Sequence, residues 1–181
     1  HTPWEWHKQL FDKAKEVGII LFSTPFDETA VDLLESLDCP IYKIASFEIV
    51  HLPLIKYVAK TKKPMIMSTG MANLAQIEEA VKVAMENGCK DLTLLHCISA
   101  YPARIEDSNL ATMIDLKKRF PGIKVGLSDH SLGTVVAVTA VALGAEVIEK
   151  HFVISRKDKA VDSAFSLEPD ELKRLCIETE Q

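Results

Sequence analysis

Six short apolar runs, rich in β-branched residues, constrain the fold of this chain more than any other feature. They span residues 18–24, 41–46, 64–69, 92–97, 123–128 and 146–152. Their apolar residues are continuous rather than alternating, which is typical of strands buried on both faces of a parallel sheet. Their centres lie roughly 23 to 31 residues apart, the length of a βα unit. The sequence therefore predicts an α/β fold with about six βα units.

Segments with helical spacing lie between these runs. Residues 71–90 carry apolar side chains at Leu74, Ile77 and Val81, with Asn73 as the predicted N-cap and Gly88 as the stop. Further helices are expected at 4–16, 26–38, 52–61, 109–120 and 133–143, and another near Pro169.

Repeated βα units are compatible with an open doubly wound sheet or with a (β/α)8 TIM barrel. An open sheet would be expected to carry one dominant glycine-rich turn, and the sequence contains no GxGxxG. Nearly every predicted strand instead ends in polar groups, which converge best if the strands close into a ring. We therefore expect residues 1–181 to form one partial TIM-barrel domain. About two βα units would be missing before residue 1.

The composition excludes several classes of partner. A net charge of −5 and a pI near 5.7 argue against a nucleic-acid or anionic membrane surface. No apolar window is long enough to span a bilayer, and the first residues lack the pattern of a signal peptide.

The cysteines show no CxxC spacing, which indicates reduced thiols in a cytoplasmic protein. They are Cys39, Cys89, Cys97 and Cys176.

Two histidines follow consecutive predicted strands at the same end of the sheet. His130 closes the segment GLSDH, and His151 closes VIEKH. Two imidazoles with open oxygen positions suit a divalent ion such as Mn²⁺ or Zn²⁺. The alternative is that one or both are structural histidines at the rim of a barrel.

A second set of strand-end groups combines one cation with several hydroxyls. Such a set matches what a phosphate or carboxylate needs, although each hydroxyl alone commonly caps a strand end. Its members are Lys43, Ser46, Ser68, Thr69, Ser99 and Ser128. Glu149 could orient a water or act as a general acid or base, or it could form an ion pair at the rim.

Several segments together resemble the sialic acid synthase family, which condenses phosphoenolpyruvate with N-acetylated amino sugars. They are TPFDETAVDLLESL, YKIASFEI, MIMSTGMANLAQIEEAV, SAYP, VGLSDHSLG, VIEKHF and DSAFSLEP. SAYP and DSAFSLEP resemble the pseudaminic acid synthase branch. N-acetylneuraminate synthases tend to carry Asn where Ser99 stands and an ending of the type DHKASLEP. The Gly-Pro that usually precedes Asp162 is here Ala160-Val161, which leaves the local turn open.

The resemblance implies a role for each candidate residue. His130 and His151 would bind a divalent metal, usually Mn²⁺, with Mg²⁺ or Co²⁺ as alternatives, and Glu149 would lie beside it. Tyr101 and Asp162 would contact the sugar. The residues implied to hold phosphoenolpyruvate are Lys43, Ser46, Ser68, Ser99 and Ser128, with Thr24 as a weaker match.

The implied reaction joins C3 of phosphoenolpyruvate to the aldehyde carbon of an open-chain sugar, with the metal as Lewis acid. The products are a nonulosonic acid and phosphate. The expected acceptor is 2,4-diacetamido-2,4,6-trideoxy-altrose, which gives pseudaminic acid. The alternatives are an N-acetylneuraminate synthase and a spore-coat polysaccharide synthase.

The resemblance also implies parts outside these residues. Family members carry two earlier strands and a C-terminal antifreeze-like domain, and they form homodimers. We therefore expect the 181-residue chain alone to have little or no synthase activity.

Two rival readings remain open from the sequence. An aldolase on the same barrel would use a Schiff-base lysine, for which Lys43 or Lys150 is available. That chemistry leaves the histidine pair unused. A non-catalytic module would bind only a metabolite or a protein partner.

Overall fold

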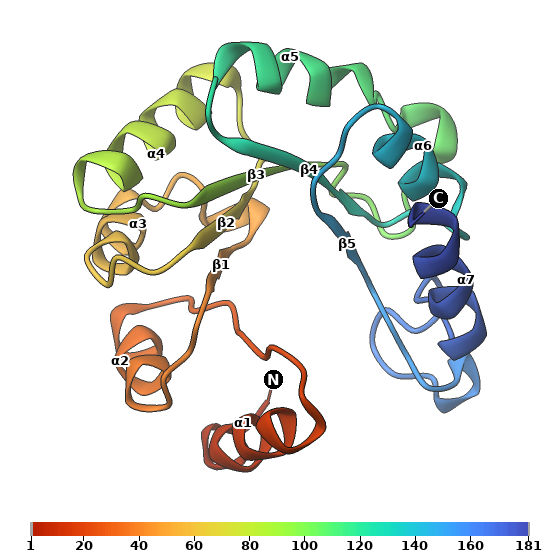
Figure 1. Ribbon diagram of the computed structural model, residues 1–181, viewed down its shortest axis with the longest axis horizontal. Coiled ribbons are helices and arrows are strands. Elements are labelled where there is room, and N and C mark those ends of the chain that lie inside the picture. Colours follow the sequence, from red (N-terminus) through yellow and green to blue (C-terminus); the bar gives the residue numbers. More distant parts are fainter. Residues whose placement is uncertain (1, 181) are drawn as a thin grey trace. The chain divides into compact units, whose positions relative to one another are not determined.

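A computed structural model describes residues 2–180, and the chain separates into two compact units (Figure 1). The first comprises the chain up to Met67 together with Ala72–Leu92. The second comprises Ser68–Met71 and the chain from Thr93 onward. Strands pair in parallel in both units, which confirms the predicted α/β class.

The first unit contains four helices and two short strands. Strands β1 (Tyr42–Ile44) and β2 (Met65–Ser68) pair in parallel, with Tyr42 opposite Met65. Helices α2, α3 and α4 lie side by side on one side of this strand pair (Figure 1). The helices are α1 (Trp4–Val17), α2 (Glu28–Ser36), α3 (Leu52–Ala59) and α4 (Leu74–Glu86).

The second unit is built on three parallel strands in chain order. Strand β4 (Lys124–Asp129) pairs with β3 (Leu92–Cys97) on one edge and with β5 (Ile148–Lys150) on the other. Helices α5 (Ala111–Arg119) and α6 (Val135–Ala142) pack against β4, and α7 (Pro169–Thr179) packs against α6 (Figure 1).

The predicted strand at 18–24 is wrong. Within the described residues this run makes one parallel bridge, between Ser23 and Tyr42, and Ile19 and Ile20 are 63% and 71% exposed. A strand needs a neighbour that takes up its backbone hydrogen bonds along its length. Here the Ser23 carbonyl accepts from the Lys43 amide at 3.3 Å, and no ladder follows. The other five predicted strands are confirmed: β3 has the predicted bounds, β4 is shifted by one residue, and the other three are shorter than predicted.

The predicted helices are all present, with ends within a few residues of those expected. Asn73 is the N-cap of α4, and its side chain accepts from the Gln76 amide at 3.0 Å. The Gln76 side chain accepts from the Asn73 amide at 2.9 Å, which completes a capping box. In residues 2–180, no helix is both long and apolar enough to cross a membrane.

Strand β1 confirms the expectation of burial on both faces. Tyr42, Lys43 and Ile44 are all buried although successive side chains point to opposite faces. The Tyr42 hydroxyl donates to Glu35 of α2 at 2.6 Å. Burial and this carboxylate both raise the pKa of Tyr42 above its usual value, so the phenol stays protonated. The opposite face of the strand carries the Lys43 side chain.

Gly126 allows β4 to approach the β5 edge, and its replacement provides a test of this packing. A Cβ at Gly126 would overlap the Val147 carbonyl oxygen and lie 2.9 Å from Leu95 Cδ2. We expect Gly126→Ala to lower the free energy of unfolding by at least about 2 kcal/mol, measured by urea denaturation. Gly122→Ala is the control, because a Cβ there meets open space and costs only the left-handed backbone, about 1 kcal/mol. Equal stability of the two variants would contradict the close approach.

Candidate functional site

The carboxyl ends of β4 and β5 bring the central candidate residues together in the second unit. The register places Ser128 opposite Glu149 and Asp129 opposite Lys150. The Ser128 hydroxyl donates to Glu149 Oε1 at 2.6 Å. Because side chains alternate along a strand, His130 continues the face of Ser128 and His151 continues the face of Glu149. One face of the strand pair therefore presents a carboxylate and two imidazoles.

The two imidazoles lie side by side, with ring centroids 5.1 Å apart. His130 is buried, and its Nδ1 lies 3.0 Å from the Ile98 carbonyl oxygen. A carbonyl can only accept, so Nδ1 must carry the proton in this bond. In the neutral ring Nε2 then keeps its lone pair, which is the arrangement that a metal ligand needs.

Burial and neighbouring charges set the protonation of the pair. Burial lowers the pKa of His151, and repulsion from His130 lowers it further, against the opposing pull of Asp162 and Glu149. Burial also lowers the pKa of His130, but contacts with the Cys97 thiol and the Ile98 carbonyl outweigh it and raise the pKa above its usual value. Of the two rings, His151 is therefore the one that stays neutral to lower pH.

The loop after β5 folds back and carries Asp162 to His151. Leu167 ties the loop closed, since its amide donates to the His151 carbonyl at 2.8 Å. Asp162 Oδ2 lies 3.8 Å from His151 Nδ1. The turn left open by Ala160-Val161 is formed with Asp162 itself in the left-handed region, at φ 65°, a conformation that Asp tolerates better than most residues. The backbone thus turns without the usual Gly-Pro.

Arg156 holds the base of the same loop against α7. Its guanidinium donates to both carboxylate oxygens of Glu171, at 2.7 and 2.9 Å, and to the Ser166 carbonyl at 2.9 Å. The Glu168 side chain accepts from the Arg156 amide at 2.8 Å. This fork geometry fixes both ends of the segment that carries Asp162.

Two aromatic rings pack against the imidazoles, and only one of them was predicted. The Tyr101 ring lies 4.4 Å from that of His130, between centroids, and is about half exposed. The Phe165 ring lies 5.0 Å from His151 and 5.8 Å from Tyr101, and it is buried. Sequence reasoning missed Phe165, although it stands three residues after Asp162 in the segment that carried the resemblance.

Ser68 and Ser99 also belong to the second unit. Ser68 is buried at the start of the short segment Ser68–Met71. This segment lies against the end of β3, because the Thr69 amide donates to the Leu95 carbonyl at 2.9 Å. A Cβ on Gly70 would come within 2.6 Å of Ser99 Oγ, so the glycine is what allows this close approach.

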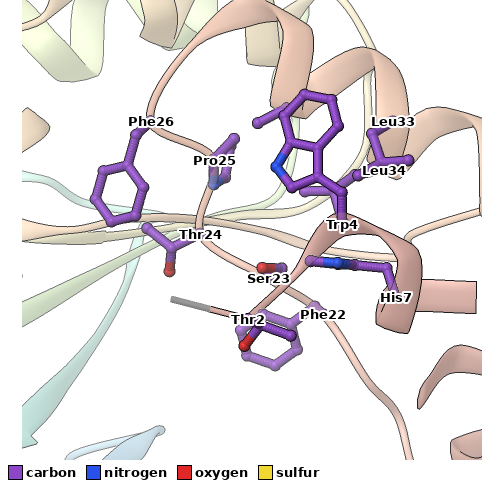
Figure 2. Close-up of a pocket in the computed structure, with 11 residues that line it drawn as sticks. Thr2, Trp4, His7, Phe22, Ser23, Thr24, Pro25, Phe26, Leu33 and Leu34 are labelled. Atoms are coloured by element: carbon purple, nitrogen blue, oxygen red, sulfur yellow. The ribbon is translucent and has the colours of Figure 1, made fainter. Parts of the chain in front are cut away.

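The first unit carries the remaining predicted residues. Lys43 and Ser46 are buried, with Lys43 on β1 and Ser46 at the start of a short 3-10 helix (Ser46–Glu48). Thr24 lines a cavity of about 420 Å³ together with Trp4 and Phe26 (Figure 2). The convergence of these three residues with the imidazole pair stays a prediction.

The donor set can be compared with what a divalent cation requires. Within residues 2–180, no three His, Cys, Asp or Glu side chains gather into a complete metal cage. Two adjacent imidazoles, one with its Nε2 lone pair available, match an open site in which water or substrate oxygens complete the shell. The residues present therefore fit a cation of this kind.

Lys150 lies on the opposite side of β5 from the imidazoles. Its Nζ is 2.8 Å from Asp129 Oδ2 and 2.5 Å from the Ser131 carbonyl oxygen, and both charged side chains are almost fully buried. An amine that donates to two acceptors in this way is not presented as a nucleophile. The geometry thus disfavours Lys150 as a Schiff-base residue.

Comparisons with known proteins agree on one family. The chain is 47% identical to the pseudaminic acid synthase of Helicobacter pylori over 96% of its length and 51% of that protein. It is 49% identical to the N,N'-diacetyllegionaminic acid synthase of Campylobacter jejuni, over 97% and 53%. It also superposes on the crystal structure of the N-acetylneuraminic acid (sialic acid) synthetase of Leptospira borgpetersenii with a TM-score of 0.96 at 35% identity, covering 99% of this chain and 62% of that one.

These relatives are longer proteins, and the chain spans about half the length of the curated ones it matches. The sequence model of the NeuB family matches residues 1–181. The predicted resemblance is thereby confirmed along the whole sequence, and the chain belongs to the NeuB family.

Proposed function

We propose that the protein containing this chain condenses phosphoenolpyruvate with an N-acetylated amino sugar to give a nonulosonic acid and phosphate. The observation that carries the proposal is the group at the ends of β4 and β5, where two adjacent imidazoles lie beside a carboxylate that a serine orients. Membership of the NeuB family supports it. We further propose that these residues are part of a TIM barrel that works as a cytoplasmic homodimer.

The names of the relatives favour an acceptor with two acetylated amines. One is a pseudaminic acid synthase, and the name of another specifies an N,N'-diacetyl product. Ser99 and Phe165 stand where the resemblance places Asn and Ala in N-acetylneuraminate synthases. We therefore favour 2,4-diacetamido-2,4,6-trideoxy-altrose over N-acetylmannosamine.

His130 and His151 would hold a divalent cation, for which we favour Mn²⁺. Bound there, the cation would supply Lewis acidity toward the aldehyde oxygen of the open-chain sugar. The Ile98 carbonyl keeps the His130 proton on Nδ1 and so directs Nε2 to the cation. Partial burial and the neighbouring His130 lower the pKa of His151 and so favour the neutral form that a ligand must have.

The remaining side chains have separable tasks. Ser128 donates its only proton to Glu149, so the carboxylate is fixed in direction and can take or hold a proton beside the reacting carbons. Tyr101 and Asp162 flank the imidazoles on their more exposed side, where a sugar would bind. Lys43 would neutralise the phosphate of phosphoenolpyruvate, with hydroxyl donors from Ser46, Ser68 and Ser99, and Thr24 would lie at the edge of this pocket. Ser128, which the resemblance groups with these hydroxyls, instead donates to Glu149.

The first prediction concerns phosphate release by the full gene product with phosphoenolpyruvate and Mn²⁺. We expect release with 2,4-diacetamido-2,4,6-trideoxy-altrose, and little with N-acetylmannosamine. His130→Ala should reduce the rate at least about 100-fold, because it removes half of the protein's cation ligands. His51→Ala, at an exposed position whose side chain makes no capping hydrogen bond to α3, is the matched control and should retain the rate.

The outcomes of this assay distinguish the proposed function from its alternatives. Release with N-acetylmannosamine alone would assign the protein to the sialic acid branch. No release with any acceptor would overturn the proposed function. A fully active His130→Ala variant would remove the cation role while leaving the reaction in place.

The second prediction concerns Glu149 and the serine that orients it. Glu149→Gln keeps the shape but removes the proton-transfer group, and we expect kcat to fall about 100-fold or more. Ser128→Ala removes only the orienting bond and should cost about 10-fold. Ser108→Ala, whose hydroxyl donates to the Ile105 carbonyl within the same turn, should leave kcat unchanged. A larger loss in Ser128→Ala than in Glu149→Gln would reverse the assigned roles.

The third prediction separates this chemistry from that of a lysine-dependent aldolase. Borohydride treatment with pyruvate and the amino sugar should leave the intact mass of the protein unchanged, because Lys150 is held by Asp129 and Ser131. A mass increase that maps to Lys43 or Lys150 would favour the Schiff-base mechanism instead.

A further inference from the structure

Behind the imidazole pair lies a buried ion pair that the proposed reaction does not use. Asp129 and Lys150 are the last residues of β4 and β5 and lie opposite each other in the strand register. Their side chains are 2% and 4% exposed, and Lys150 Nζ lies 2.8 Å from Asp129 Oδ2. Because side chains alternate, this pair occupies the face away from Ser128 and Glu149. It can therefore act on the site only through the backbone.

The contacts of this pair surround His130 in the sequence. Lys150 Nζ donates to the Ser131 carbonyl, and the other oxygen of Asp129 accepts from the Ser131 amide at 2.8 Å. Asp129 and Ser131, the two neighbours of His130 in the sequence, are thus both bound to Lys150, which immediately precedes His151. The His130 carbonyl is held separately by the Ala103 amide at 3.0 Å, on the side of β3. The strand pairing ends at Asp129 and Lys150. Past this point, the bond from the Lys150 ammonium to the Ser131 carbonyl connects the His130 segment to β5.

We propose that Lys150, with Asp129, is a positioning residue that sets the separation of the His130 and His151 imidazoles for a divalent cation. This inference rests on the proposed function, in which those imidazoles are the cation ligands. A buried ion pair adds little net stability over an apolar pair of similar size, so its contribution here lies in geometry. Burying Lys150 without a charged partner would cost free energy, so Lys150 and Asp129 require each other.

The test compares Mn²⁺ affinity, measured without substrates, in variants of the full gene product. Lys150→Met alone leaves the Asp129 charge buried and unpaired, which is strongly destabilising. The informative variant is Asp129→Asn with Lys150→Met, which removes both charges and keeps an oxygen for the Ser131 amide. We expect its Mn²⁺ affinity to fall about 10- to 100-fold. Lys150→Arg, which keeps a donor to both acceptors, should recover most of the affinity.

Lys117→Met is the matched control. Lys117 also binds a carbonyl and a carboxylate in the second unit, through contacts with Gly144 at 2.6 Å and Glu146 at 3.4 Å. These partners lie before β5, at the other end of the strand from the imidazoles. We expect this variant to bind Mn²⁺ within about 3-fold of the parent. An equal loss of Mn²⁺ affinity in Lys117→Met and in the double variant would indicate a general loss of stability and overturn the proposal.

A second readout needs no metal. In the metal-free double variant, hydrogen exchange should be faster at the Ser131 amide and at the Leu167 amide, which donates to the His151 carbonyl. A folded double variant with parental exchange and parental Mn²⁺ affinity would overturn the positioning role. If the parent protein itself binds no Mn²⁺, the proposed cation role fails. Faster exchange confined to these amides would still support the Asp129–Lys150 pair as the device that holds the two segments together.

Discussion

The parallel pairing of β4 with β5 is the constraint on which the candidate site depends. Gly126 leaves room for the Val147 carbonyl, and the Leu127 amide donates to that same carbonyl at 2.9 Å. From this point the ladder sets Ser128 opposite Glu149. A shift of β5 by one residue would exchange its two faces and send the His151 imidazole to the side of the strand pair away from His130. The chemistry of the site is therefore a consequence of register.

Each face of this strand pair has a different task. The face with Ser128 and Glu149 presents groups that can bind and transfer protons. The opposite face buries the side chains of Asp129 and Lys150, with each charge compensated by the other. Alternation along a strand makes such a division possible within three residues. A short motif can thus carry both the imidazole side of the strand pair and the ion pair behind it.

The loop between β5 and α7 contributes further side chains around His151. Arg156 binds Glu171 of α7, and the Leu167 amide returns to the His151 carbonyl. Between these fixed ends, Asp162 and Phe165 reach His151 from one turn. Loops of this kind carry functional residues because a rigid scaffold holds their ends while their sequence is free to vary. A buried aromatic ring such as Phe165 sets the shape of the space beside the imidazoles.

The sequence by itself determined the α/β class, every helix and five of the six strands, since these follow from local periodicity and caps such as Asn73. It also indicated His130, His151 and Glu149 as candidates, because they lie at or just beyond the ends of consecutive strands. The strand predicted at residues 18–24 is wrong, because apolar residues alone do not provide a neighbouring strand to pair with. Only the tertiary structure decided that Phe165 packs on the imidazoles and that Lys150 is bound to Asp129. These contacts join residues that are distant in the chain, and they depend on register and loop closure, which no local pattern specifies.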